Sequence, residues 1–210
     1  QNLVEAELEW EPSIDSSEIG VSVANGVVTL SGAVPTYAEK IAAERCAMRI
    51  KGVHGVAQEI EVRPFGDVGV KDDEIAKRAL RMLDWNTMIP PDAVKVKVED
   101  GRVTLSGEVD WNFEREAADR LVQGLYGVRA VTNHLKVKSR VQADNVHSRI
   151  EDALKRQSRL EASKIRVFVD GGKVRLEGKV HAWADRATIE HAAWAAPGVT
   201  SVDDRVTITA

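Results

Sequence analysis

The sequence predicts an α+β protein built from three small tandem units, each ordered helix, strand, strand, helix, strand. The first observation is a glycine spacing, with gaps of six and then twenty residues, that occurs three times: Gly26, Gly32, Gly52; Gly101, Gly107, Gly127; Gly172, Gly178, Gly198. The second is that helical and strand-like periodicities recur at the same offsets from these glycines. We expect each unit to be a mixed three-stranded sheet with two helices on one face, over residues 1–64, 70–139 and 143–210.

Each unit begins with an amphipathic helix. Apolar residues recur every four positions on one face of it, namely Ile75, Ala79 and Leu83 in the second unit and Val146, Ile150 and Leu154 in the third. Leu8 is their counterpart in the first unit, which puts Gln1 inside a helix, so we expect the start to have been trimmed. Trp10 and Trp85 follow at equivalent positions, where we expect them to close the helix end against the sheet.

Two alternating strands joined by a two-residue turn come next. The turns are Asn25-Gly26, Asp100-Gly101 and Gly171-Gly172. Such pairs tolerate the positive φ that a two-residue hairpin requires at both positions, so we expect positive φ at the glycine in the second position of each turn: Gly26, Gly101 and Gly172. The glycines six residues later predict a bulge or a close backbone approach.

A second helix is expected over residues 38–50, 113–125 and 184–195. Gly52, Gly127 and Gly198, each followed by valine, indicate its end. Cys46 lies within the first of these helices and is expected to be a small core residue. A last strand follows, parallel to the second strand by the right-handed crossover rule if both share a sheet. Linkers are expected at about residues 63–70 and 139–143.

This pattern resembles the BON domain. The helix, hairpin, helix, strand order carries the resemblance, as do the runs from Gly26 to Gly32 and from Gly101 to Gly107 and the Gly-Val pairs before each last strand. The family takes its name from an osmotically inducible periplasmic protein and from nodulation proteins. The resemblance implies a bacterial, periplasmic or envelope-associated protein with a role in binding phospholipid. A cytoplasmic location is the alternative, because no signal peptide is visible in the sequence.

Composition excludes several classes of protein. With 43% hydrophobic and 30% charged residues and a net charge of −4, the chain has the composition of an ordinary globular protein rather than of a general polyanion binder. No apolar run approaches the roughly 18 residues of a membrane span. The charge is uneven, at −5 for residues 1–66 and +1 each for residues 71–140 and 141–210. Nucleic-acid binding is therefore disfavoured.

No catalytic or metal-binding pattern is present. The five histidines are scattered, no nucleophile recurs at a repeated position, and one cysteine rules out an internal disulfide. We expect no enzyme, no cofactor and no metal.

The outer face of the sheets is the first candidate surface. The hairpin register places Arg166 opposite Glu177 and Phe168 opposite Arg175, which neutralises part of the basic face. The expected free positive charge is Lys95, Lys97, Lys164 and Lys179. We favour the interpretation that this face is an ordinary solvated sheet surface. The functional alternative is a binding site for an anion or a lipid headgroup.

Aromatic residues near the start of the second helix are the other candidates. Trp111, Phe113 and Trp183 suit a membrane interface, and packing between units is the favoured alternative.

Two functions therefore stay open. The first is a non-enzymatic envelope or stress-associated module that binds anionic phospholipid or the membrane surface, with its working surface on the second and third units. The second is a protein-interaction scaffold for other envelope proteins, which the acidic first unit and its uncharged sheet face favour.

Overall fold

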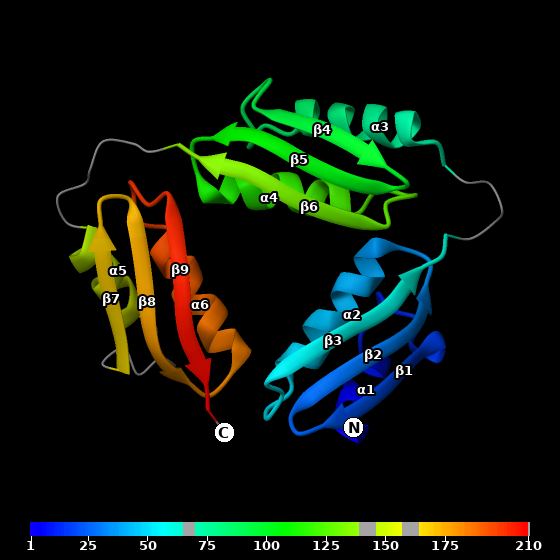
Figure 1. Ribbon diagram of the computed structural model, residues 1–210, viewed down its shortest axis with the longest axis horizontal. Coiled ribbons are helices and arrows are strands. Elements are labelled where there is room, and N and C mark those ends of the chain that lie inside the picture. Colours follow the sequence, from blue (N-terminus) through cyan, green and yellow to red (C-terminus); the bar gives the residue numbers. More distant parts are fainter. Residues whose placement is uncertain (65–69, 139–145, 157–163, 210) are drawn as a thin grey trace. The chain divides into compact units, whose positions relative to one another are not determined.

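The computed structural model describes residues 1–64, 70–138, 146–156 and 164–209 and contains the expected three repeats (Figure 1). Three separate three-stranded sheets are present, each with its strands in sequence order. By contact density the chain divides into two compact units, Gln1–Gly107 with Phe113–Leu135, and Glu108–Asn112 with Lys136–Ala210. Each repeat is described by itself below. The expected linkers fall largely on residues 65–69 and 139–143, outside the described residues.

The order of elements agrees with the prediction in all three repeats. The first contains α1 (Asn2–Trp10), a short 3-10 helix η1 (Ser16–Glu18), β1 (Ile19–Ala24), β2 (Val27–Val34), α2 (Tyr37–Arg49) and β3 (Gly55–Val62). The second contains α3 (Asp72–Trp85), β4 (Val94–Glu99), β5 (Arg102–Val109), α4 (Asn112–Gln123) and β6 (Ala130–Val137). The third contains α5 (Val146–Lys155), β7 (Ile165–Asp170), β8 (Lys173–Val180), α6 (Trp183–Trp194) and β9 (Ser201–Ile208).

The middle strand of each sheet is the second one, which the sequence did not decide. β1 pairs antiparallel with β2, and β2 pairs parallel with β3; β7, β8 and β9 repeat this arrangement. The parallel pairing confirms the crossover prediction. The register of the third hairpin is also as predicted, with Arg166 opposite Glu177 and Phe168 opposite Arg175. In the second hairpin Lys97 lies opposite Thr104.

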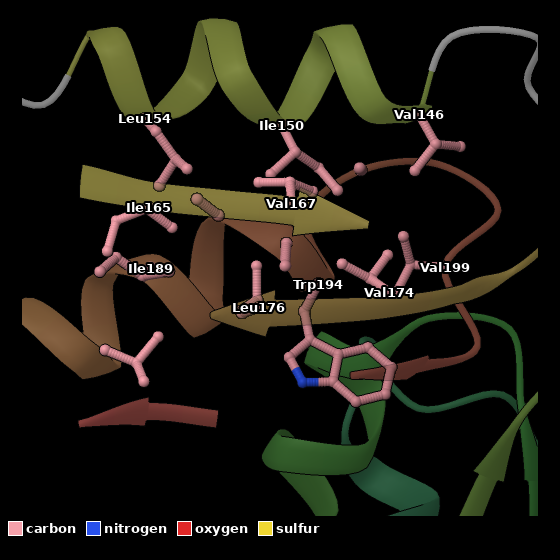
Figure 2. Close-up of a cluster of buried hydrophobic side chains, with 14 of the residues drawn as sticks. Val146, Ile150, Leu154, Ile165, Val167, Val174, Leu176, Ile189, Trp194 and Val199 are labelled. Atoms are coloured by element: carbon pink, nitrogen blue, oxygen red, sulfur yellow. The ribbon is translucent and has the colours of Figure 1, made fainter. Parts of the chain in front are cut away.

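One face of each sheet is buried against the two helices (Figure 1). In the third repeat Val146, Ile150 and Leu154 of α5 point together toward the sheet, where Ile165 and Val167 of β7 lie next to them, and Val174 and Leu176 of β8 belong to the same buried cluster (Figure 2). Cys46 is fully buried in the core of the first repeat, as expected. The alternation of buried and exposed positions along the strands follows from this one-sided packing.

The turn glycines agree with the prediction in two repeats. Gly26 has φ 78° and Gly101 has φ 73°, each after a residue with φ 50°. The prediction for Gly172 was wrong, because in the third turn the positive φ, of 56°, belongs to Gly171. A second glycine leaves this turn free to depart from the geometry that Asn-Gly and Asp-Gly adopt.

The close backbone approach expected at Gly32, Gly107 and Gly178 is confirmed. A Cβ at Gly107 would collide with the carbonyl oxygen of Ala93, and one at Gly32 with that of Glu18. The second strand of the hairpin passes so close to the residue before the first strand that only glycine, which has no Cβ, fits at these positions.

The helix-stop interpretation needs correction. Gly52 has φ 87°, but α2 has already ended at Arg49, and Ile50 is extended at φ −77° and ψ 128°. The amide of Val53 donates to the carbonyl oxygen of Ile50 at 3.2 Å, which makes Gly52 the third residue of a separate turn. Positive φ at that position is what a type II turn requires, and Pro197 before Gly198 fits the same turn in the third repeat.

The prediction that Trp10 and Trp85 close the helix ends against the sheet was wrong. Their exposed fractions are 85% and 89%. Leu8 and Leu83 supply the buried contact at the helix end instead, and the tryptophans project from the other side of the helix.

Candidate functional site

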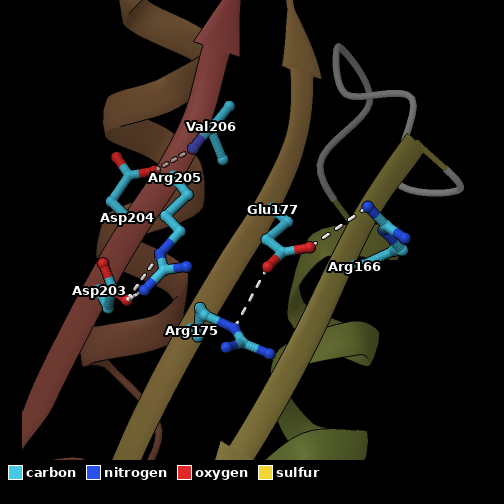
Figure 3. A network of polar contacts seen from close by, with 7 residues as sticks. All are labelled: Arg166, Arg175, Glu177, Asp203, Asp204, Arg205 and Val206. Carbon is cyan, nitrogen blue, oxygen red and sulfur yellow. Dashed lines mark hydrogen bonds and ion pairs between the residues drawn. The ribbon is translucent and has the colours of Figure 1, made fainter.

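The outer face of the third sheet carries a charged row that crosses all three strands. Register places Arg166 of β7 beside Glu177 of β8, and Glu177 beside Arg205 of β9. Glu177 forms ion pairs with two arginines: Arg166 Nη2 lies 3.2 Å from Oε2, and Arg175 Nε lies 3.3 Å from Oε1 (Figure 3). The predicted Arg166–Glu177 pair is confirmed. So is the stacking of Arg175 on Phe168, with Cζ 4.6 Å from the ring centroid.

A depression of about 510 Å³ lies along this row. Two of the predicted lysines, Lys164 and Lys179, meet there. The complete lining is four cations, one carboxylate and a glycine: Lys164, Arg166, Glu177, Gly178, Lys179 and Arg205. Asp203 pairs with Arg205 at 2.8 Å beside the depression, so four cations stand there against the two carboxylates Glu177 and Asp203.

The two lysines predicted in the second repeat behave differently. Lys95 is exposed beside Ser106, as the register predicts. Lys97 was expected to be free, and this was wrong: its Nζ lies 2.9 Å from Glu99 Oε1. Residues two apart on a strand share a face, so a long lysine reaches the next carboxylate along its own strand. Cross-strand register alone misses this pairing.

The predicted aromatics are only partly available at the surface. Trp111 and Trp183 are half-buried, whereas Phe113 is exposed. Arg186 lies over the ring of Trp183 at 5.1 Å and pairs with Asp204 at 2.7 Å. Trp183 is thus held in a packed layer of side chains rather than presented to an interface.

A second surface, on the second repeat, was missed by the sequence reasoning. Trp85 lines a groove of about 380 Å³ together with Arg81, Met82, Asn86 and Leu121. We call these five residues the Trp85 groove. The Asn86 side chain accepts a hydrogen bond from the amide of Met88 at 2.8 Å, which fixes the turn beside the tryptophan. Leu80 and Met88 of the second repeat are also exposed.

Trp10 is equally exposed, but its surroundings are acidic. Glu7, Glu9 and Glu11 flank it in the sequence, and Arg49 pairs with Glu7 at 3.3 Å and Glu11 at 3.7 Å. One arginine therefore faces a cluster of carboxylates. The two exposed tryptophans share a position in the fold but not an electrostatic environment.

Two signals in the sequence could have found these surfaces. The alternation of Val206 and Ile208 puts Arg205 on the outer face, but the prediction considered only the hairpin strands. Trp85 lies two residues beyond Leu83, on a different side of the helix from the buried residues spaced four apart.

Nothing in the described segments points to catalysis or metal chemistry. No group of three or more His, Cys, Asp and Glu side chains there could hold a metal ion. Burial raises the pKa of the Cys46 thiol, which keeps this side chain protonated and unreactive in the folded state. No helix among the described residues has both the length and the apolar character that a membrane crossing requires.

Comparisons with known proteins agree with the internal repeat. The family model described as the BON domain matches residues 1–64, 71–139 and 142–210. Osmotically-inducible protein Y of Escherichia coli (strain K12) is 33% identical over 139 residues, which cover 64% of this chain and 69% of the relative.

Solved structures add little. A structural protein of the type III secretion system of Chlamydia trachomatis, CdsD, is 16% identical and overlaps 99% of this chain and 91% of its own, with a TM-score of 0.27. The C-terminal domain of CdsD gives 16% identity, coverages of 100% and 96%, and a TM-score of 0.28. At such scores the likeness supports no conclusion about this chain.

Proposed function

Because this chain belongs to the BON-domain family, we propose that it is a non-enzymatic, stress-associated module of the bacterial envelope that binds the anionic surface of a phospholipid membrane. The relative's name, osmotically-inducible protein Y, supports the link to osmotic stress. A periplasmic location fits the same resemblance. We also propose that the three repeats are separate domains, 1–64, 70–139 and 143–210.

The exposed Trp85 beside its groove is the observation that carries this proposal. A tryptophan that is 89% exposed leaves a large apolar ring in water unless something covers it. Tryptophan is enriched at the membrane–water interface, where its ring reaches the acyl boundary and its indole N–H stays hydrated. Met82 and Leu121 extend the apolar contact into the groove.

The charges around Trp85 favour an anionic lipid surface. Arg78, Arg81 and Trp85 lie at helical spacings of three and four along α3, so they share one side of the helix. Each basic residue close to an anionic bilayer contributes about 1 kcal/mol of attraction. Three of the four acidic residues of α3, Asp72, Asp73 and Glu74, lie in its first turn, at the end opposite Trp85. The fourth, Asp84, directly precedes Trp85, and Arg78 pairs with Glu74 at 3.6 Å, so Arg81 is the basic residue that the ion pairs leave beside the tryptophan.

Vesicle flotation of the full chain tests the proposal. Vesicles of phosphatidylglycerol with phosphatidylcholine, and vesicles of phosphatidylcholine alone, are compared at low and high salt. We expect binding to the anionic vesicles only, weakened by salt. Trp85→Ala should lower that binding about tenfold or more, the value of burying one large apolar side chain.

Trp10→Ala is the matched control, since it removes the same side chain from the equivalent position. It should leave binding unchanged. Both tryptophans are exposed, so both variants should fold, which circular dichroism checks. Equal binding of wild type and Trp85→Ala, or no binding of wild type to anionic vesicles, would overturn the membrane proposal.

A protein-interaction scaffold is the second candidate. It is favoured by the outer face of the first hairpin, where Gly20, Ser22, Ala24 and Thr29 carry no charge. Cross-linking in envelope extracts, with Ser22→Lys as the disrupting variant, distinguishes it. A partner that is lost with Ser22→Lys, together with absent vesicle binding, supports the scaffold.

A further inference from the structure

We propose that the basic depression of the third repeat binds a phosphate-bearing anion, as a site separate from the membrane contact at Trp85. Its positive side chains come from three neighbouring strands and from the residue that precedes β7. Arg166 and Arg205 flank Glu177 in one row, and Lys179 occupies the next outward position on β8. The cations thus converge on one point of the sheet rather than spreading along an edge.

The other two repeats show that the fold does not require this charge. Positions are compared by the constant glycine offset. The counterparts of Lys164, Arg166, Glu177, Lys179 and Arg205 are Ala93, Lys95, Ser106, Glu108 and His134 in the second repeat. In the first repeat they are Glu18, Gly20, Ser31, Ala33 and Glu59. The same place therefore carries two carboxylates in the first repeat, one lysine, one histidine and one carboxylate in the second, and four cations and one carboxylate in the third.

Ion pairs on the outer face of the sheet hold the two arginines of the depression, Arg166 and Arg205. Glu177 is 26% exposed and takes one contact from Arg166 and one from Arg175. Asp203 binds Arg205 through both Nε and Nη2, at 2.9 and 2.8 Å, which leaves the other amino group of the guanidinium for a ligand. These contacts fix the two arginines before a ligand arrives, which lowers the entropy lost on binding.

The chemistry of the lining favours phosphate. Two guanidinium groups can each donate paired hydrogen bonds to phosphate oxygens, and two ammonium groups add compact positive charge. A volume of about 510 Å³, open to solvent, admits a group larger than a single phosphate. Both the headgroup of a phospholipid and a soluble phosphate compound offer this chemistry.

Titration of the full chain with inorganic pyrophosphate, followed by backbone amide NMR shifts, tests the site. We expect saturable shifts on the outer face of β7, β8 and β9, and small ones at the counterpart positions of the first repeat. Lys179→Gln combined with Arg205→Gln should weaken pyrophosphate binding at least about tenfold. Arg149→Gln with Lys155→Gln on α5 makes the same charge change on the helix layer and should leave the affinity unchanged.

Other outcomes decide both the site and its source. Trp85→Ala should keep full pyrophosphate binding, which separates this site from the membrane proposal. Vesicles of phosphatidylglycerol that compete with pyrophosphate identify the headgroup as the source, and absence of competition identifies a soluble phosphate. The proposal is overturned if pyrophosphate shifts all three repeats alike or none, or if the double variant binds as the wild type does.

Discussion

The first and second repeats share one frame, by which we mean the same order of elements, the same buried positions and the same glycines. The surfaces beside their equivalent exposed tryptophans, however, differ in charge. Arg81 and Met82 line the groove of Trp85, and Leu80 and Met88 are exposed in the same stretch of sequence; the counterparts of Leu80, Arg81, Met82 and Met88 in the first repeat are Glu5, Ala6, Glu7 and Ser13. The buried positions do not change in kind, since Val4 and Leu8 pack as Ala79 and Leu83 do. A small repeat thus keeps its core and its glycines while the solvent side of one helix changes from acidic to basic and apolar.

The largest expected effect tests the shared frame. Gly32→Val and Gly107→Val place a β-branched side chain at φ 111° and 132°, directly against a backbone carbonyl. Each should lower the free energy of unfolding by about 3 kcal/mol or more. Urea unfolding measures both. If one is tolerated and the other is not, the two repeats do not share the frame described here.

Charge reversal at the second repeat should have the next largest effect. Arg78→Glu with Arg81→Glu removes two attractive charges and adds two repulsive ones beside Trp85. Binding to phosphatidylglycerol vesicles should fall at least about thirtyfold, at about 1 kcal/mol for each attraction lost. Flotation measures it, and an undiminished affinity would place the membrane contact elsewhere.

A transplant should build the missing surface in the first repeat. Glu5→Leu, Ala6→Arg and Glu7→Met give Trp10 the surroundings of Trp85, at the loss of the Arg49–Glu7 pair on the surface. Vesicle binding of the Trp85→Ala protein should recover about tenfold. No recovery would mean that neighbouring residues on α3 are not sufficient for the contact.

The smallest effect concerns Cys46, which reports on the first repeat alone because Leu121 and Ala192 hold its place in the others. Its raised thiol pKa leaves less thiolate at neutral pH than an exposed cysteine has. Alkylation should be slow in the folded protein and faster once urea opens the first repeat. Gly32→Val should accelerate it and Gly107→Val should not; equal acceleration by both would mean that the repeats unfold together.

The sequence was sufficient for the frame because each element has a local cause. The two-residue turns Asp100-Gly101 and Gly171-Gly172 determine the hairpin registers. These registers place Lys97 opposite Thr104 and Arg166 opposite Glu177. The middle position of β2 in its sheet depends on long-range packing, which no local pattern encodes. Gly172 was misplaced because two adjacent glycines leave the turn type open.

The candidate surfaces were less predictable for a similar reason. The basic depression needs Arg205, which lies far along the chain from Arg166 and joins it only through the parallel pairing of β8 with β9. Lys97 looked unpaired because its partner, Glu99, is on its own strand. Trp85 was expected in the core because large apolar residues are usually buried. The structure shows that Leu83 takes the buried position at this helix end and that Trp85 is exposed.

The most direct test of the claim that Trp85, and not Trp10, contacts the membrane is the quenching of tryptophan fluorescence by anionic vesicles with brominated acyl chains. Trp10→Ala and Trp85→Ala are compared with the wild type under identical conditions. We expect vesicle-dependent quenching to persist in Trp10→Ala and to be lost in Trp85→Ala. Quenching that survives in Trp85→Ala but disappears in Trp10→Ala would contradict it, because the membrane contact would then belong to the acidic repeat.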